Sequence, residues 1–384
     1  MRLPLDGIRV LDLSWIIAGP TATRLLAIMG AEVVKIGSSR RPDPSYSGPA
    51  FHSYNQSKHY ASINIASEQG VEIVRTLASL SDVVIENFAT GVIERRGLGY
   101  QELRKSNPSI IMISSSGVGH TGPKKDHVAY GSLLQHYTGW NSQSGYPGGT
   151  PIKGGLWADP WVGMELAMVI ATCLNYRASS GEGQYVDFSM AEALVGSMAM
   201  SVIHQQITGQ PLLPQGNEDY FDLHSGVYPC EGDDRWVSLS VRSMEQWRSL
   251  CDLVGALEFK SENPKNTLSK RGANNFISNW TRQHSDLEAT EALQSLGIAS
   301  APSWNVYHVY QDDFLKESNY LVETETNDGE TRFMPGVPWW FDDGLTPNVK
   351  AAPKLGRDNR LIFRDLLGIE DKEYLGLVKS KVLE

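Results

Sequence analysis

The chain has 384 residues, 41% of them hydrophobic, and a formal net charge of −10. This length predicts two domains or one large elaborated domain, and the acidic balance argues against nucleic acid as a general partner. No apolar run reaches the length of a membrane span, the N-terminus lacks a secretory signal, and three scattered cysteines match neither a disulfide framework nor a metal site, so we expect a cytoplasmic protein with no membrane partner and no bound metal.

The first 116 residues alternate between strand and helix patterns. Short apolar runs predict strands, and amphipathic segments that stop at Gly30 or before Pro108 predict helices. In chain order we predict a strand at 8–13, a helix at 21–29, a strand at 31–36, a helix at 67–81, a strand at 82–86, a helix at 100–106 and a strand at 110–115. Repeated βαβ units make parallel sheets, so we predict an α/β fold with a doubly wound open parallel sheet.

The pattern of apolar and charged residues changes after Gly209. Before it, a long helix over 160–178, a strand over 185–189 and an apolar helix to about 206 are predicted. After it we predict a linker, a hairpin over 227–240, charged helices over 244–295 and, from 322, a tail that ends in an amphipathic helix. The centre of the chain therefore combines a predicted hairpin with predicted helices.

Small polar residues follow the predicted strands of the first part. Ligands on doubly wound sheets bind beyond the carboxyl ends of the strands. These ends carry Ser14-Trp15, Gly37-Ser38, Glu86-Asn87-Phe88 and 114–117. Such a rim suits a phosphate-bearing ligand, but the Gly-x-Gly-x-x-Gly fingerprint is missing after the first strand, which argues against a nicotinamide dehydrogenase.

One carboxylate stands between an apolar stretch and a long helical pattern. Asp159 follows Trp157 and Ala158 and is followed directly by Pro160. A carboxylate before a proline at the first helical position is typical of a helix N-cap. An ionised carboxylate with few charged neighbours is also what a covalent nucleophile requires. Both interpretations stay open at this point.

A cationic set lies in the N-terminal half of this acidic chain. Arginine and lysine near a glycine-bearing rim suit phosphates, and solvated surface charges beside ordinary turns are the alternative. The set consists of Lys58, Arg95, Arg96, Lys124 and Lys125.

The order of several short motifs resembles that of the family III (CaiB/BaiF) CoA-transferases, the group of formyl-CoA transferase and crotonobetainyl-CoA:carnitine CoA-transferase. The resembling segments run from 5–13 to 352–356 and so cover nearly the whole chain. They include Ala18-Gly19-Pro20, 29–36, Glu86-Asn87-Phe88 with 97–99, 180–189, and 226–233 with Trp236.

The resemblance implies a fold and an assembly. The family has a Rossmann-like large domain and a smaller α+β domain, which here would be residues 1–205 with 322–384 and residues 206–321. In the family two chains thread through one another, so an interlocked homodimer is the expected assembly.

The resemblance also implies a reaction. Asp159 falls where the family keeps its catalytic aspartate, which attacks an acyl-CoA thioester. Coenzyme A would then pass to a carboxylic acid acceptor through covalent aspartyl anhydride and aspartyl-CoA thioester intermediates. Coenzyme A is thus the expected cofactor-like substrate, and no metal is required.

Further roles follow by position in the family's motifs. The predicted coenzyme A contacts are Trp15, Ile16, Ala18, Arg40, Arg41, Lys58, Asn87, Phe88, Arg95, Lys124 and Lys125. Arg40 and Arg41 lie just beyond Gly37 and Ser38, where the family usually has an acidic residue and often an arginine. Gly216 is the nearest counterpart of the family's glycine loop. Ile17 replaces the glutamine of formyl-CoA transferase, which argues against oxalate as a substrate.

Two other activities are compatible with the same family. In α-methylacyl-CoA racemase a histidine assists the aspartate, and here that place falls near Tyr130, a poor base at neutral pH, so transfer is favoured. A catalytically silent CoA-binding protein is the other alternative.

Tryptophans near the proposed site bear on the acyl group. Trp140 and Trp157, with Trp15 and Trp161, could form an aromatic cage for a quaternary ammonium acid such as carnitine. They could equally hold an aromatic or branched acid, or simply pack.

Overall fold

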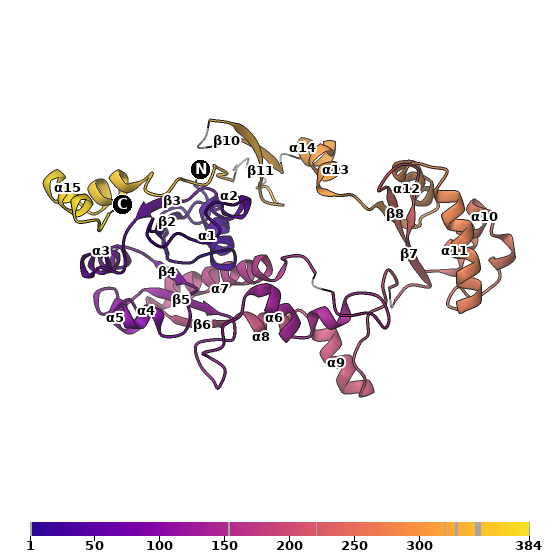
Figure 1. The fold of residues 1–384 in the computed structure, drawn as a ribbon, viewed down its shortest axis with the longest axis horizontal. Helices are drawn as coiled ribbons and strands as arrows, with labels where there is room; N and C mark the ends of the chain where they lie inside the picture. The colour runs from indigo at the N-terminus through magenta and orange to yellow at the C-terminus, as the bar shows by residue number, and fades with distance from the viewer. Residues whose placement is uncertain are drawn as a thin grey trace. The chain divides into compact units, whose positions relative to one another are not determined.

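The computed structural model describes residues 2–152, 154–219, 221–318, 320–326, 329–341 and 347–383, with the backbone alone at 267–270. The chain divides into two compact units, one of Met1–Trp140, Lys153–Ile207 and Glu317–Glu384, the other of Asn141–Ile152 and Thr208–Lys316 (Figure 1). Residues 141–152 lie in the second unit because Gly216 N–H donates to Gly145 O at 2.8 Å and the Tyr146 ring packs against Gly216. The predicted domain boundaries at 205/206 and 321/322 stay a prediction.

A parallel sheet forms the centre of the first unit. Its order among the described residues is β3-β2-β1-β4-β5-β6, and every neighbouring pair is parallel. The strands are β1 (Arg9–Asp12), β2 (Glu32–Gly37), β3 (His59–Ser62), β4 (Val83–Glu86), β5 (Ile111–Ser116) and β6 (Tyr185–Ser189). The predicted α/β parallel sheet is confirmed, and β3 is a strand that the sequence pattern did not predict.

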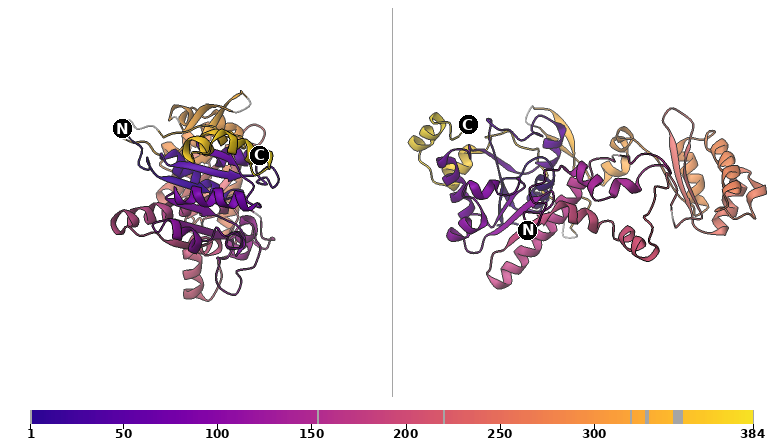
Figure 2. Two further views of the ribbon diagram at one scale, coloured as in Figure 1. Left: turned by 90° about the vertical axis from the view of Figure 1, so that its left-hand side faces the viewer. Right: turned by 60° about the horizontal axis from the view of Figure 1, so that its bottom comes forward.

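Helices cover both faces of this sheet (Figures 1 and 2). On one face, α1 (Ala18–Ile28), α7 (Ala158–Ser180) and α8 (Met190–Gly196) share a core with strand residues such as Val10 and Val83. On the other, α3 (Glu68–Ser79), α5 (Tyr100–Ser106), the π-helical turn Leu361–Leu366 and α15 (Asp371–Lys379) pack on Leu11 and Val84. Burial on both faces explains why the strands read as continuous apolar runs.

The two helices that matter most for the site approach each other closely. A Cβ at Gly163 of α7 would lie 2.4 Å from Thr21 Cβ and 2.7 Å from the Ala18 carbonyl oxygen of α1. Only glycine permits this separation, so Gly163 allows the start of α7 to pack directly against the first turn of α1.

The C-terminal part of the chain returns to the first unit. The hairpin of β10 (Leu321–Glu325) and β11 (Thr331–Pro335) leads to Gly336, whose carbonyl oxygen accepts a hydrogen bond from Arg24 Nη2 at 3.0 Å. Farther along, Leu383 pairs with Ile63 in an isolated antiparallel bridge beside the β3 edge of the sheet (Figure 1).

The second unit contains an antiparallel sheet covered by helices. Strands β7 (His224–Pro229), β8 (Trp236–Val241) and β9 (Ala299–Pro302) pair in that order, which confirms the predicted hairpin. Buried and outward positions alternate along β8, and its buried side chains pack on α10 (Met244–Val254), α11 (Thr267–Thr281) and α12 (Asp286–Ser295). Across both units, no helix in the described ranges has the length and hydropathy of a membrane span.

Candidate active site

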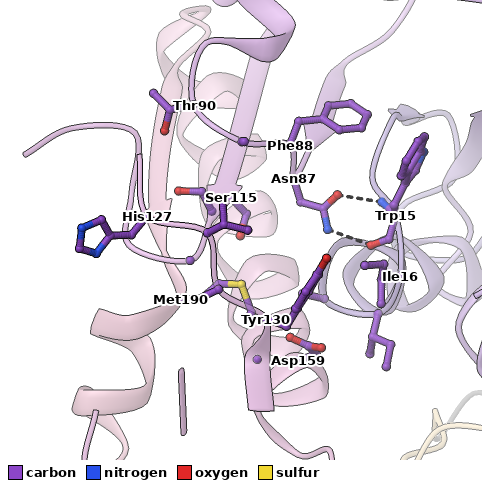
Figure 3. A pocket seen from close by; sticks show the side chains of 18 of the residues that line it. Trp15, Ile16, Asn87, Phe88, Thr90, Ser115, His127, Tyr130, Asp159 and Met190 are labelled. Atoms are coloured by element: carbon purple, nitrogen blue, oxygen red, sulfur yellow. Dashed lines mark hydrogen bonds between the residues drawn. The ribbon is translucent and has the colours of Figure 1, made fainter. Parts of the chain in front are cut away.

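The loops after β1 and β4 meet where the strand order of the sheet reverses, which is where open α/β sheets bind ligands. The Asn87 amide joins them: its Oδ1 accepts from Trp15 N–H and its Nδ2 donates to Trp15 O, both at 2.8 Å (Figure 3). A side chain 72 residues away in the sequence therefore fixes the Trp15 peptide.

Two cavities lie on either side of this junction, and Trp15 and Phe88 line both of them. The two rings stand edge to face with centroids 5.4 Å apart. We call the first cavity, of about 200 Å³, the Asp159 cavity. The second, of about 300 Å³, is the arginine cavity, lined by Arg40, Arg41 and Arg96.

Asp159 lies in the first turn of α7 and is not its N-cap. The helix begins at Ala158, and Trp157 occupies the cap position without a side-chain cap hydrogen bond. The first helical bond, from Trp161 N–H to Trp157 O at 3.0 Å, sets this start. The interpretation of Asp159 as a helix cap is therefore wrong, although the helix dipole still favours an anion in the first turn.

The Asp159 carboxylate is half-buried and has no hydrogen-bond or ion-pair partner in the described part of the chain. No described residue donates a hydrogen bond or forms an ion pair with it, and burial raises its pKa to about 6. It touches the start of α6 (Gly131–Tyr137), since a Cβ at Gly131 would lie 2.2 Å from Asp159 Oδ1. A carboxylate with a raised pKa that faces a cavity suits a nucleophile or a base.

The loop opposite Asp159 is strained. Ile16, which lines the Asp159 cavity, has φ +68°. The left-handed region is unfavourable for a β-branched residue, and such outliers cost on the order of 1–3 kcal/mol and cluster at active sites. The Ile16 N–H donates to both carboxylate oxygens of Asp43 at 3.2 Å.

The structure brings most of the predicted site residues together. Around the Asp159 cavity lie Trp15, Ile16, Ile17, Ala18, Asn87, Phe88, Lys125, Tyr130 and Asp159. Around the arginine cavity lie Arg40 and Arg41 with Trp15 and Phe88. Outside both linings are Lys58, Arg95, Lys124, Trp140, Trp157 and Gly216.

Lys58 corrects the sequence interpretation most clearly. Its ammonium is fully buried and donates to Asp12 Oδ2 at 3.1 Å, to Asn55 Oδ1 at 2.9 Å and to Pro20 O at 3.0 Å. Burial alone would raise the pKa of the Asp12 carboxyl, but Lys58 and Lys35 outweigh it and hold that pKa well below its usual range. Lys58 is thus half of an internal ion pair and cannot contact a coenzyme A phosphate.

Two other predicted cations also point elsewhere. The guanidinium of Arg95, the last residue of α4 (Val92–Arg95), folds back over Gly91. Its neighbour Arg96 lines the arginine cavity instead, and sequence adjacency gave no means of choosing between them. Lys124 Nζ donates to the Tyr137 hydroxyl at 2.7 Å.

The tryptophans do not gather into one cage. Trp157 packs on Trp140 and Trp161 with ring centroids 4.3 and 6.5 Å apart, whereas Trp15 pairs with Phe88.

Gly216, the predicted counterpart of the family's glycine loop, belongs to the second unit.

Ionisable neighbours of Asp159 differ in orientation. In Figure 3 the exposed Tyr130 side chain lies beside Asp159, while the His127 ring turns away from it. Met190 and Ser115 also line the cavity; Met190 carries no signal of a site in the sequence, and Ser115 only that of a polar strand end.

Metal ligands do not cluster in the described part of the chain. No group of three or more His, Cys, Asp or Glu side chains there could hold a metal ion. The expectation of a metal-free site stays an expectation.

Comparison with known proteins gives a consistent family. The family model described as CoA-transferase family III matches residues 5–359. The chain is 29% identical to succinate–glutarate CoA-transferase from Agrobacterium fabrum, with 96% of each chain covered. It is 26% identical to formyl-CoA:oxalate CoA-transferase from Rhodopseudomonas palustris, covering 100% of this chain and 98% of the relative. A crystal structure of a CAIB/BAIF family protein from Brucella suis superposes with a TM-score of 0.86 at 27% identity, covering 95% of this chain and 100% of the other.

Proposed function

This chain belongs to CoA-transferase family III, and we propose that it moves coenzyme A from an acyl-CoA thioester to a carboxylic acid with Asp159 as the covalent nucleophile. The observation that carries the proposal is the half-buried Asp159 carboxylate, with which no described residue pairs, in a cavity that shares its Trp15–Phe88 wall with an arginine-lined cavity.

The chemistry proceeds by acyl exchange at Asp159. A carboxylate oxygen attacks the thioester carbonyl, the C–S bond breaks, and a mixed anhydride and coenzyme A thiolate form. The thiolate attacks the aspartyl carbonyl, which releases the donor acid and leaves an aspartyl-CoA thioester. The acceptor carboxylate displaces the thiolate to form a second anhydride, and the thiolate then attacks the acceptor's acyl carbon. The product acyl-CoA leaves and Asp159 is restored, so no proton or electron is gained or lost.

Apolar side chains protect these intermediates. Ile16, Ile17 and Met190 line the Asp159 cavity, and a water-poor cavity slows hydrolysis of an anhydride and strengthens the nucleophile. These walls also favour an acid with an apolar substituent over oxalate.

The assay that tests the proposal supplies an acyl-CoA and a panel of monocarboxylic and dicarboxylic acids in deuterated water, with products followed by mass spectrometry. The proposal requires a new acyl-CoA that depends on the acceptor. Deuterium uptake at the α-carbon without any acceptor would instead establish the racemase, for which Tyr130 beside Asp159 would be the second acid–base group.

Arg96 should contribute to coenzyme A affinity and Arg95 should not. Three arginines over an apolar floor of Leu13, Ile36 and Ile93 suit the adenosine phosphates of coenzyme A. A hydrogen bond to a charged group contributes about 1.5–3 kcal/mol, so Arg96→Ala should raise KM for acyl-CoA about tenfold or more and leave kcat near that of the wild type. The matched variant Arg95→Ala should change KM less than about twofold. Equal effects of the two variants would contradict this assignment.

The pH profile of kcat/KM should have an acidic limb that is set by ionisation of the Asp159 carboxylate. Only the ionised carboxylate attacks, and burial raises its pKa to about 6. The value of kcat/KM should therefore fall as the pH drops through about 6 and reach a plateau above it. Burial also raises the pKa of Glu86, to about 7, so Glu86→Gln is the control. A limb that moves in Glu86→Gln would show that Asp159 is not the titrating group.

An exposed apolar stripe supports the proposed homodimer. Trp161, Met164, Met168 and Tyr176 follow one another at helical spacing along α7 and are all exposed. In α9 (Ala199–Thr208) no residue is buried. Exposed apolar patches of this kind are typical of protein interfaces, and a second copy of the chain, interlocked with the first, is the partner we propose.

A further inference from the structure

The backbones of three consecutive residues after β1 are each held by a side chain from elsewhere in the fold. The Ser14 carbonyl oxygen accepts from Lys35 Nζ at 2.6 Å. The Trp15 peptide is bridged by the Asn87 amide, and the Ile16 N–H is held by Asp43. Ile16 is the strained member of the three, so its conformation depends most on its clamp.

The Asp43 carboxylate is buried and fixed by hydrogen bonds. It is 3% exposed, its Oδ1 accepts from Ser45 N–H at 2.9 Å and from Ser45 Oγ at 2.7 Å, and its Oδ2 lies 3.6 Å from Lys35 Nζ. The groups in these contacts with the two oxygens, Ile16 N–H, Ser45 N–H and Oγ–H, and Lys35 Nζ, are all donors.

The segment that carries Asp43 also reaches the arginine cavity. Arg40 and Arg41 line that cavity, and the Arg41 guanidinium lies 5.0 Å over the Trp15 ring. One short stretch, residues 40–43, thus contacts the proposed phosphate site, the wall between the cavities and the strained peptide that faces Asp159.

We propose that Asp43 is a positioning residue that ties occupancy of the arginine cavity to the conformation of the Ile16 peptide opposite Asp159. The proposal rests on the proposed transferase function. Phosphates drawn to Arg40 and Arg41 fix the 40–43 segment, and Asp43 then holds Ile16 in the conformation that shapes the nucleophile's side of the cavity. Misplacement of a site by about 1 Å is enough to cost on the order of 100-fold in rate.

Asp43→Ala should lower kcat by about 10- to 100-fold and change KM for acyl-CoA by less than about threefold. Alanine removes both carboxylate oxygens that accept from Ile16 N–H, so the strained peptide loses its side-chain partner. The control Ser45→Ala removes only the Ser45 Oγ bond to Asp43 and should keep kcat within about twofold.

Repeating the Asp43 substitution in the Ile16→Gly variant distinguishes a positioning role of Asp43 from general damage to the fold. Glycine adopts positive φ without strain, so the kcat penalty of Asp43→Ala should shrink to less than about fivefold there. An equal penalty in both backgrounds would overturn the proposal.

Amide hydrogen exchange of the wild-type protein tests the same coupling without a variant and without turnover. The nucleotide end of coenzyme A, added as its adenosine bisphosphate fragment, should slow amide hydrogen exchange of residues 14–18 in the full-length protein severalfold. Unchanged exchange with the fragment demonstrably bound would refute the coupling. If the wild-type protein showed slowed exchange but no transferase activity, the proposed function would be refuted and the coupling would still hold.

Discussion

Asp159→Asn is expected to lower acyl transfer by about 1,000-fold or more while coenzyme A binding stays within about threefold of the wild type. Asparagine keeps the size of the side chain but cannot form the anhydride, and Asp159 has no described partner whose loss would disturb the fold. Turnover is measured with the acceptor panel, and affinity by calorimetry with free coenzyme A.

The matched control is Glu165→Gln, a second carboxylate of α7 that lines neither cavity. It should keep turnover within about twofold, as surface substitutions usually do. Full activity in Asp159→Asn would show that another group is the nucleophile, whereas a silent CoA-binding protein would show no transfer in the wild type either.

Lys58→Met is expected to lower the free energy of unfolding by about 3–5 kcal/mol, because breaking a buried ion pair is strongly destabilising, and only the more distant Lys35 would remain as a positive charge near Asp12. Asp12 would lose its contact with Lys58 in a site with no exposed surface. Chemical denaturation measures the effect. Lys105→Met, which breaks an exposed pair with Glu102, should cost less than about 1 kcal/mol.

The double variant Asp12→Asn with Lys58→Met checks the physical reason. Removing both charges should recover part of the stability lost in Lys58→Met. A stable Lys58→Met with a raised KM for acyl-CoA would favour the phosphate contact that the family resemblance implied, and would contradict the buried pair.

Local sequence pattern predicted the sheet where burial on both faces leaves a clear signal. Strands β1, β2, β4 and β5 are almost entirely buried, so they read as apolar runs. Strand β3 contains His59, Tyr60 and Ser62 and lies at the edge of the sheet. Its short, mixed pattern gave no comparable signal.

The site could be predicted only in part because its geometry depends on long-range contacts. The strand-end loops were visible in the sequence, but the strand order that joins Trp15 to Asn87 is not a local property. The same holds for Lys58, which lies 46 positions from Asp12 and pairs with it inside the fold. In the sequence, a basic residue near the polar strand ends looks the same whether its side chain faces a ligand or a buried carboxylate.

Chemical trapping on Asp159 tests the central claim most directly. The wild-type protein is incubated with an acyl-CoA donor, quenched with hydroxylamine or borohydride, digested, and mapped by mass spectrometry. We predict a modified carboxyl at Asp159 that depends on the donor and is missing from Asp159→Asn. Sustained transfer with Asp159 unmodified, or with the label on another carboxylate, would contradict the account.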